Sequence, residues 1–395
     1  MSEKIKNIDA IKVLDSRGEE TIKVKVKSEN HEASFVVPQG KSKGYYEAIF
    51  LPPDVAINNL KELVLPLVRG KEVNFREIDK ILIEADNTPQ KRSFGANTIL
   101  GTSLAVAKLQ AKIEKKHLFV FLSQFFKDQK KNFNLLMNLI NGGIHSFNGP
   151  PFQEYLIIIN GDSFKESVFL GAEVYREIGK SLKTNIGDEG GYVPIERDVE
   201  FPLRLFTEII QRRGIGEKVS IGIDVAATQF FQNEGYLLGD KDFTNEELRK
   251  FYLEILKKYN ITYLEDPFFE DDFEGFALFK KEAGNCLIIG DDLTVTNVVR
   301  LKRAIEQNSI SGLIIKPNQI GTLSETINTI NLARENNLEV VISHRSGDTN
   351  DSFISDLAIA SGAWGLKTGS PARGERVAKY NRLIEIEEMK DENQN

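Results

Sequence analysis

Six short stretches in the second half of the chain decide its fold, because each is an apolar run that ends in a polar or charged residue. They are Ser220-Ile-Gly-Ile-Asp224, Ile261-Thr-Tyr-Leu-Glu265, Cys286-Leu-Ile-Ile-Gly-Asp291, Gly312-Leu-Ile-Ile-Lys316, Val340-Val-Ile-Ser-His344 and Trp364-Gly-Leu-Lys367. After one longer interval they recur about every 25 residues, with amphipathic stretches such as 245–258 and 323–336 between them. This alternation predicts a parallel β/α barrel.

The polar strand ends of such a barrel meet at one face, where these barrels hold their active sites. Any one of the six could be a solvated loop residue, but together they predict a shared pocket. Three of them, Asp224, Glu265 and Asp291, are carboxylates with no cysteine or histidine among them. Oxygen ligands of this kind suit Mg²⁺. The alternative is that the three residues cap helices or form salt bridges.

Two of these carboxylates have a second carboxylate beside them, Asp266 and Asp292, so the sequence alone leaves open which one points inward. Pro267 predicts an extended conformation at Asp266, because the residue before a proline avoids the helical region. This favours Glu265 over Asp266 as the ligand.

The other strand ends carry Lys316, Lys367 and the triplet His344-Arg345-Ser346. A lysine can act as a general base if burial or nearby cations lower its pKa. A guanidinium beside a hydroxyl can hold a phosphate or a carboxylate, although Arg345 could equally form a structural salt bridge. A metal, a lysine base and an anion clamp together predict removal of a proton next to a carboxylate, with cations stabilising the dianionic product.

The first part of the chain has a different pattern of apolar and polar residues. Within residues 21–27, Ile22, Val24 and Val26 alternate with lysines, which predicts a half-solvated antiparallel strand, and residues 33–38 are its expected partner strand. Helical patterns follow near 55–68, 75–85 and 97–115. The polar stretch 127–132 is the best candidate for a domain boundary.

Composition excludes several classes of protein. The chain has 51 basic and 58 acidic residues, a net charge of −7, which argues against a nucleic-acid or anionic-membrane surface. The single cysteine, Cys286, excludes an intrachain disulfide and a cysteine-based zinc cluster, and its apolar neighbours predict an inert buried thiol. No apolar run is long enough to span a membrane, and the N-terminal sequence lacks the apolar core of a signal peptide. We therefore expect a cytoplasmic protein.

The chain closely resembles the enolase family, a branch of the enolase superfamily, in a series of motifs that follow one another in order from about residue 8 to residue 388. These are Leu14-Asp-Ser-Arg-Gly18, Gly95-Ala-Asn-Thr-Ile-Leu-Gly101, Asn141-Gly-Gly-Ile-His145, Phe152-Gln-Glu-Tyr155, Gly187-Asp-Glu-Gly-Gly-Tyr-Val-Pro194, Leu264-Glu-Asp-Pro267, Gly290-Asp-Asp-Leu-Thr-Val-Thr-Asn297, Ile315-Lys-Pro-Asn-Gln-Ile-Gly-Thr-Leu323, Ser343-His-Arg-Ser-Gly347, Leu366-Lys-Thr-Gly369 and Glu375-Arg-Val-Ala-Lys-Tyr-Asn381. Several of these motifs are long, and their conjunction is very specific.

The resemblance implies an α/β protein: an N-terminal α+β capping domain, residues 1–130 with a mobile lid loop at 38–44, and a catalytic enolase-type (TIM-like) β/α barrel, residues 131–395. The first barrel strands would depart from the regular β/α order. It also implies a lyase that catalyses the Mg²⁺-dependent, reversible dehydration of 2-phosphoglycerate to phosphoenolpyruvate in glycolysis and gluconeogenesis. The family further implies a homodimer or a higher homo-oligomer.

The resemblance also implies roles for individual residues. Lys316 would remove the C2 proton, and Glu189, assisted by Glu154, would protonate the leaving hydroxyl. The other implied roles are a tight metal site at Asp224, Glu265 and Asp291, phosphate binding by Arg345 and Ser346, carboxylate binding by Lys367, and a site lining of His145, Gln153 and His344. Asp188 is a rival for the role of the acid, but the motif favours Glu189.

The lid departs from the family pattern. The family reads Pro-Ser-Gly-Ala-Ser-Thr-Gly, whereas this chain reads Pro38-Gln-Gly-Lys-Ser-Lys-Gly44. We place Gln39 at the serine that helps bind a second, weaker metal, so the resemblance supports one tight Mg²⁺ and leaves the second open. Lys41 and Lys43 are either solvated loop residues or cations that partly replace this metal or meet a more anionic substrate.

Three functions therefore remain in competition. The first is a glycolytic enolase, and the second is an enolase paralogue that acts on a related phosphonate or carboxylated substrate in a secondary pathway. Both use a small phosphorylated carboxylate or its analogue, and they differ at Gln39, Lys41 and Lys43. The third is a noncatalytic scaffold or surface-binding protein, which the retention of every polar position named above disfavours.

Overall fold

The alternating residues near the N-terminus form an antiparallel sheet, as expected. The computed structural model, which describes residues 3–41, 44–127 and 133–392, orders its strands β1 (Asn7–Leu14), β2 (Glu20–Lys27) and β3 (Glu32–Val36). Ile22, Val24 and Val26 are fully buried, whereas Lys23 and Lys25 on the opposite face are only partly covered. The sequence pattern did not predict β1, whose burial does not alternate.

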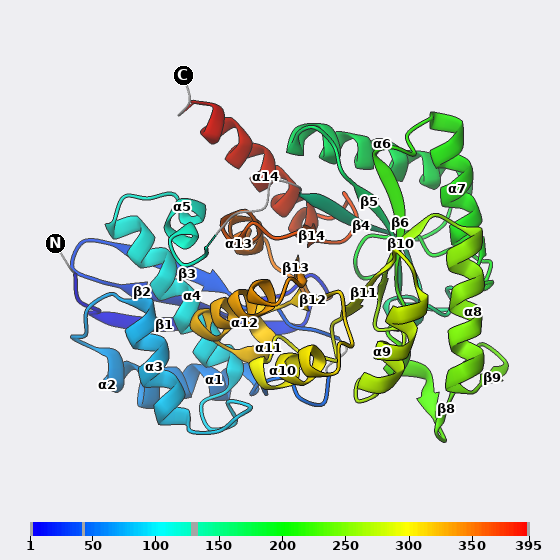
Figure 1. Ribbon diagram of the computed structural model, residues 1–395. Helices are drawn as coiled ribbons and strands as arrows, with labels where there is room; N and C mark the ends of the chain where they lie inside the picture. Colours follow the sequence, from blue (N-terminus) through cyan, green and yellow to red (C-terminus); the bar gives the residue numbers. More distant parts are fainter. Residues whose placement is uncertain (1–2, 42–43, 128–132, 393–395) are drawn as a thin grey trace.

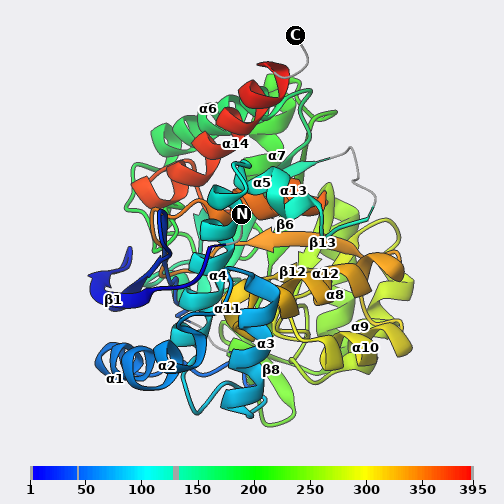
Figure 2. The ribbon, with the colours of Figure 1, turned by 90° about the vertical axis from the view of Figure 1, so that its left-hand side faces the viewer.

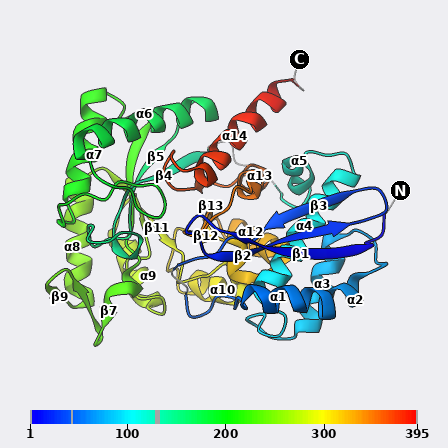
Figure 3. The same cartoon turned by 180° about the vertical axis from the view of Figure 1, so that it is seen from behind.

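Helices cover the buried face of this sheet (Figure 3). The helices of this part are α1 (Pro53–Asn59), α2 (Leu65–Val68), α3 (Phe75–Asp86), α4 (Ala96–Ile113) and α5 (Leu118–Ser123), and the π-helical turn η1 (Leu60–Val64) joins α1 to α2. Of these helices, α1 and α4 contact the sheet directly. The helix α4 lies against β2 so closely that a Cβ at Gly101 would come within 2.4 Å of Val24 Cγ2. A glycine is therefore required at this crossing.

The apolar runs of the second half form a closed barrel (Figure 1). Its strands are β4 (Asn134–Asn141), β5 (Glu154–Ile159), β6 (Val219–Asp224), β10 (Ile261–Glu265), β11 (Leu287–Gly290), β12 (Gly312–Ile315), β13 (Glu339–Ser343) and β14 (Gly365–Lys367). All neighbours pair in parallel except β5, which is antiparallel to both β4 and β6. The barrel and the departure of its first strands from β/α order are confirmed.

Side chains fill the inside of the barrel, so it is a packed core rather than a pore. The inner cluster consists of Leu136, Leu156, Ile158, Tyr263, Ile289, Ile314 and Val341, all buried. The outer faces of the strands pack against the surrounding helices, as expected for strands that are apolar on both sides.

The larger helices of the barrel are α6 (Phe164–Leu182), α7 (Phe201–Arg213), α8 (Asn245–Lys258), α9 (Phe273–Glu282), α10 (Val298–Glu306), α12 (Leu323–Glu335), α13 (Phe353–Ser361) and α14 (Gly374–Glu392). Short turns of helix occur at η2 (Gly143–His145), η3 (Ala227–Phe230) and α11 (Pro317–Ile320). A small sheet of β7 (Phe231–Gln232), β8 (Gly235–Leu238) and β9 (Lys241–Phe243) accounts for the long first interval.

The N-terminal part packs against the parallel side of the barrel, where α3 and α4 contact α12, α4 contacts α11, and α5 contacts α13 (Figure 2). The polar stretch expected to separate the two parts lies almost entirely outside the described residues, so the boundary at 130/131 remains a prediction. None of the described helices is long and apolar enough to cross a membrane.

Candidate active site

The six predicted strand-end residues come together at one end of the barrel. Asp224, Glu265 and Lys367 are the last residues of their strands, and Asp291, Lys316 and His344 directly follow theirs. The Lys367 ammonium joins three strands, since Nζ lies 2.8 Å from Asp224 Oδ2, 2.9 Å from Glu265 Oε1 and 3.2 Å from Glu154 Oε2. These side chains are buried, so they form one ionic network beneath the barrel mouth.

Lys316 is paired with the third carboxylate of the predicted metal set. Its ammonium donates to Asp291 Oδ2, and Gln319 Nε2 donates to Asp291 Oδ1 at 3.0 Å. Burial would lower the pKa of Lys316, but the charge on Asp291 more than offsets this and the pKa is raised. For Lys316 to act as a base, its pKa must therefore be lowered by an additional positive charge near Asp291.

The structure separates Glu265 from its neighbour Asp266. Glu265 points to Lys367 and accepts a hydrogen bond from Tyr263 Oη at 2.6 Å. Asp266 instead accepts the backbone N–H groups of Asp291 and Asp292 at 2.9 and 2.7 Å, so its carboxylate fixes the loop after β11. The extended conformation expected at Asp266 is wrong, because its φ is +43°, a left-handed value that this pair of hydrogen bonds holds in place.

A second cluster of titratable groups lies beside Lys367 on the antiparallel side. Glu154 begins β5, and His145 Nδ1 lies 3.7 Å from Glu154 Oε1 and 3.5 Å from Glu189 Oε1. Asn138 Nδ2 donates to Glu189 Oε2 at 3.0 Å. The glycines around Glu189 serve the packing of its own loop, because Gly187 and Gly191 lie against Asn141 too closely for a Cβ.

The environments of the two glutamates push their pKa values in opposite directions. Burial and the charge on Glu189 raise the pKa of Glu154 well above its usual range. Burial would also raise the pKa of Glu189, but His344 and His145 more than offset it and lower this pKa. Two buried carboxyls whose pKa values are driven apart are typical of an acid that carries a proton beside an ionised partner.

The tautomer of His344 follows from its neighbours. Arg376 Nη1 lies 2.5 Å from His344 Nδ1, and a guanidinium can only donate, so Nδ1 accepts and Nε2 carries the proton. Nε2 lies 3.3 Å from Glu189 Oε2. Burial lowers the pKa of His344 to about 4. A neutral imidazole thus presents its N–H to Glu189.

Arg345 is held by Glu47, a residue that the sequence analysis did not single out. Its guanidinium lies 3.0 Å from Glu47 Oε2 and 3.1 Å from Glu47 Oε1, and it also donates to Asn318 Oδ1 at 2.9 Å. The salt bridge considered as an alternative for Arg345 is therefore present, and an anion would have to share this arginine with Glu47.

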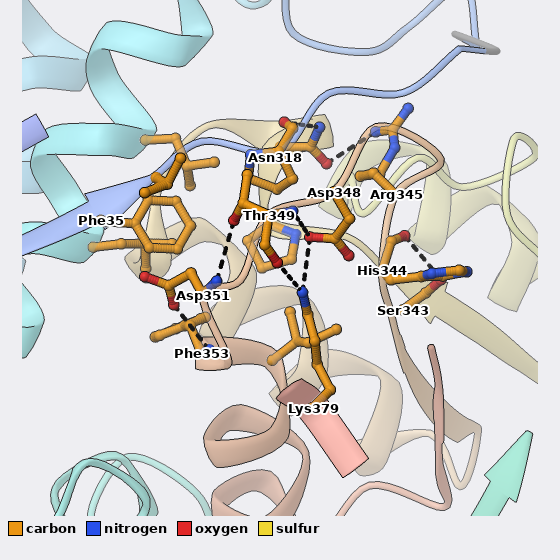
Figure 4. Close-up of a pocket in the computed structure, with 16 residues that line it drawn as sticks. Phe35, Asn318, Ser343, His344, Arg345, Asp348, Thr349, Asp351, Phe353 and Lys379 are labelled. Atoms are coloured by element: carbon orange, nitrogen blue, oxygen red, sulfur yellow. Dashed lines mark hydrogen bonds and ion pairs between the residues drawn. The ribbon is translucent and has the colours of Figure 1, made fainter. Parts of the chain in front are cut away.

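Behind this loop, Lys379 donates to Asp348 Oδ1 at 3.0 Å and to the Thr349 carbonyl at 2.5 Å (Figure 4). These residues and Asn318 line a cavity of about 20 Å³, enough for one water molecule. The loop that carries His344 and Arg345 is thus fixed from behind by buried polar contacts.

By its chemistry, the predicted donor set of three carboxylates suits a hard divalent cation. Asp224, Glu265 and Asp291 are buried carboxylates, and burial together with the charge on Asp224 raises the pKa of Glu265 to about 8. A bound cation would relieve this repulsion. Gln153, whose Nε2 donates to Asp224 Oδ2 at 3.4 Å, keeps a buried Oε1 with no hydrogen-bond partner among the described residues.

Among the described residues, two groups of three have ligand atoms that all lie within 4.8 Å of one another: His145, Glu154 and Glu189, and Asp266, Asp291 and Asp292. The predicted set of Asp224, Glu265 and Asp291 is not such a group. Asp291 is the only member of the predicted metal set in either group. In the second group Asp266 already accepts two backbone hydrogen bonds, which makes it a poorer ligand than Glu265.

The first part of the lid lies against the loop that follows β13. Gln39 N donates to the Gly347 carbonyl at 2.7 Å and Gly347 N donates back at 2.9 Å, and Lys41 N donates to Ser346 Oγ at 2.7 Å. Lys41 also lines a pocket of about 880 Å³, together with His145 and Asp188. Lys43 lies outside the described residues. A second metal at Gln39 remains a prediction.

Sequence reasoning missed three residues that organise the site: Glu47, Tyr263 and Arg376. Tyr263 lies inside an apolar run, Glu47 comes from the other part of the chain, and Arg376 lies on α14, so none of them stands at a strand end. Only the quoted tail motif contained Arg376, and it assigned this residue no role.

Comparison with known proteins gives a consistent result over both parts of the chain. The family described as "Enolase, N-terminal domain" matches residues 5–122, and "Enolase, C-terminal TIM barrel domain" matches residues 133–395. A protein named enolase from Methanocaldococcus jannaschii is 41% identical over 97% of this chain and 95% of its own length. Enolases of Aeropyrum pernix and Ehrlichia ruminantium (strain Welgevonden) are 39% and 40% identical over 98% of this chain, and over 94% and 96% of their own lengths.

Proposed function

Because the chain belongs to the enolase family of lyases, we propose that it catalyses the Mg²⁺-dependent, reversible dehydration of 2-phosphoglycerate to phosphoenolpyruvate in glycolysis and gluconeogenesis. The observation that supports this best is the buried network at the barrel mouth, in which a lysine-and-carboxylate side faces a pair of glutamates with divergent pKa values. The reaction needs both, since an amine must remove a proton and an acid must protonate a poor leaving group.

Each residue has a role that its contacts support. Lys316 removes the C2 proton, and the pair of Glu189 and Glu154 delivers a proton to the 3-hydroxyl, with His145 and His344 holding Glu189 in place. Asp224, Glu265 and Asp291 would hold Mg²⁺. That ion would supply positive charge for the ene-diolate and would favour the neutral form of Lys316.

The remaining contacts bind the anionic groups of the substrate. Arg345 and Ser346 bind the phosphate, Lys367 binds the carboxylate side, and Gln153 lines the site. Because Lys367 already bridges three carboxylates, its pKa is raised well above the usual range and it stays charged through the reaction.

The direct test is a steady-state assay of purified protein on 2-phosphoglycerate with a Mg²⁺ titration, following phosphoenolpyruvate. We expect turnover that depends on Mg²⁺ and is absent from a Lys316→Ala preparation made in parallel, which controls for contaminating enolase. No turnover at any Mg²⁺ concentration would refute the proposal.

A second candidate is a paralogue that acts on a related phosphonate or carboxylated substrate. The lid supports it, because Lys41 introduces a cation at the mouth where the family has an alanine. A panel of such analogues separates the two: a kcat/KM above that for 2-phosphoglycerate would favour the paralogue. For either function we propose a cytoplasmic homodimer or higher homo-oligomer, which light scattering would test.

A further inference from the structure

The lid lysine Lys41 forms an ion pair with a loop residue beside the proposed acid Glu189. Its ammonium donates to Asp188 Oδ2 at 2.9 Å, and Asp188 directly precedes Glu189 in the chain. Both side chains are partly open to solvent, with exposed fractions of 44% for Lys41 and 30% for Asp188. An ion pair at this level of exposure contributes little to stability, so it is easily exchanged.

The two backbones do not depend on this ion pair. Lys41 N donates a hydrogen bond to Ser346 Oγ, and Gln39, two residues earlier, exchanges two backbone hydrogen bonds with Gly347. The Asp188 N–H donates to the His145 carbonyl at 3.2 Å, and the Asp188 carbonyl accepts from Arg376 at 3.5 Å. The side chains can therefore separate while both backbones stay in place, which argues against a structural latch.

The other cations at the mouth are committed to buried carboxylates. Lys367 bridges Asp224 and Glu265, Lys316 is paired with Asp291, and Arg345 is paired with Glu47, with side-chain exposures of 13% or less. Lys41 differs because its partner is a partly solvated carboxylate. The Lys41 ammonium can therefore pair with a substrate anion without leaving a buried charge unpaired. Leaving a buried charge unpaired would cost far more free energy.

The ammonium can also reach the proposed phosphate position. Lys41 N lies 2.7 Å from Ser346 Oγ, so its Cα is within about 4.2 Å of that oxygen when the N–Cα bond of about 1.46 Å is added. From there a flexible stem of four carbons carries the ammonium. The ammonium can therefore reach a substrate phosphate that is hydrogen-bonded to the Ser346 hydroxyl.

We propose that Lys41 is a phosphate-binding residue of this enzyme, held by Asp188 in the ligand-free protein and transferred to the substrate phosphate on binding. This deepens the proposed function and rests on it, because it assumes a phosphorylated substrate. Asp188 is then the resting partner of Lys41 and competes with the substrate for it.

The exchange of partners requires that substitutions of Lys41 and Asp188 shift KM in opposite directions, and the test measures these shifts. Lys41→Ala should raise KM for 2-phosphoglycerate about tenfold and leave kcat nearly unchanged, because the contact is made equally in the ground state and the transition state. Asp188→Asn should lower KM about two- to threefold, since the ammonium no longer has to leave a partner. In the Lys41→Ala background, Asp188→Asn should have no effect.

Two controls accompany these variants. Lys41→Arg should keep most of the affinity, because it keeps the cation. Lys250→Ala removes another exposed lysine and its ion pair with Glu246, on the outer helix α8, and should leave KM unchanged. An unchanged KM in Lys41→Ala, or a shift of the same sign in Lys41→Ala and Asp188→Asn, would overturn the proposal; the latter would indicate a latch.

Direct titration with inorganic phosphate at constant Mg²⁺, followed by calorimetry, separates this inference from the proposed reaction. Weaker phosphate binding by Lys41→Ala supports the role of Lys41 even if 2-phosphoglycerate is not turned over. Equal binding by both proteins, or no phosphate binding by the wild type, overturns it even if the enzyme is an active enolase.

Discussion

The parallel and antiparallel sides of the barrel place functional groups at the same mouth in opposite ways. From β10 to β14, the polar residue stands at or just after the carboxyl end of its strand, as with Glu265 and Lys316. On the other side β5 runs in the reverse direction, so Glu154 is its first residue and pairs in register with Asp224, the last residue of β6. Strand direction therefore decides which end of an apolar run carries the chemistry.

The two sides also carry different chemistry. The parallel side contributes lysines and the carboxylates that pair with them, whereas the antiparallel side and its loops contribute Glu154, Glu189 and His145. Lys367 of β14 joins the two, since its ammonium reaches both Glu265 and Glu154. The proposed function places proton removal on one side and proton delivery on the other, and substitutions on the two sides should separate these steps.

The largest effect is expected on the parallel side. Lys316→Ala removes the only amine assigned to the C2 proton, so both turnover and exchange of that proton with solvent should fall about 10⁴-fold. Exchange is measured by NMR with 2-phosphoglycerate in deuterated water. If exchange survives in this variant, proton removal does not belong to Lys316 and the division between the two sides is wrong.

The antiparallel side should show the complementary pattern. Glu189→Gln keeps the shape but removes one carboxyl of the pair that delivers the proton, so dehydration should fall about 10²–10³-fold while exchange at C2 persists. Glu154→Gln should act in the same direction, and the double variant should be little worse than either single one, because the two glutamates act as a unit. Additive losses would mean that Glu154 and Glu189 act independently.

The same contrast explains how much of the molecule the sequence could predict. The parallel strands and their end residues follow from local pattern, because a strand buried on both faces is apolar until it reaches the mouth. Glu154 and Glu189 came only from the resemblance to a family, since one begins a strand and the other lies in a loop. The pattern of β2 was also readable, but β1 was not, because its residues do not alternate between buried and exposed.

The local sequence pattern could not predict contacts between distant parts of the chain. The pairing of Arg345 with Glu47 and the hydrogen bond from Arg376 to His344 each join residues from different elements, and no periodicity marks them. The turn at Asp266 was mispredicted for a related reason: two tertiary hydrogen bonds override the preference of a residue before proline.

A moderate effect is expected in the pH dependence of Mg²⁺ binding. The pKa of Glu265 is raised to about 8 by burial and by Asp224, so below pH 8 the metal must displace a proton. Apparent Mg²⁺ affinity, measured by calorimetry, should rise nearly tenfold from pH 6 to pH 7 and level off above pH 8. Glu265→Gln should flatten this dependence, whereas Glu154→Gln on the other side should keep it. A flat profile in the wild type would contradict the assignment.

The smallest effect concerns the contact between the N-terminal part and the barrel. Among the described elements, only those on the parallel side of the barrel pack closely against the N-terminal part. Asp79 of α3 is fully buried and accepts the Ser324 N–H at 2.9 Å, at the start of α12. Burial raises its pKa from 3.8 to about 6, so the folded state binds a proton more tightly than the unfolded chain. The stability from this group is complete below pH 3.8 and is lost as the pH rises through 6.

Lowering the pH from 7 to 5 should therefore increase the free energy of unfolding of the wild type by about 1 kcal/mol relative to Asp79→Asn, whose amide oxygen can still accept the Ser324 N–H. Urea denaturation of both proteins at the two pH values measures this difference. Glu84→Gln, an exposed position on the same helix, is the matched control and should follow the wild type. Parallel pH profiles for the wild type and Asp79→Asn would show that Asp79 stays ionised, and that the parallel side is held to the N-terminal part without a proton-sensitive contact.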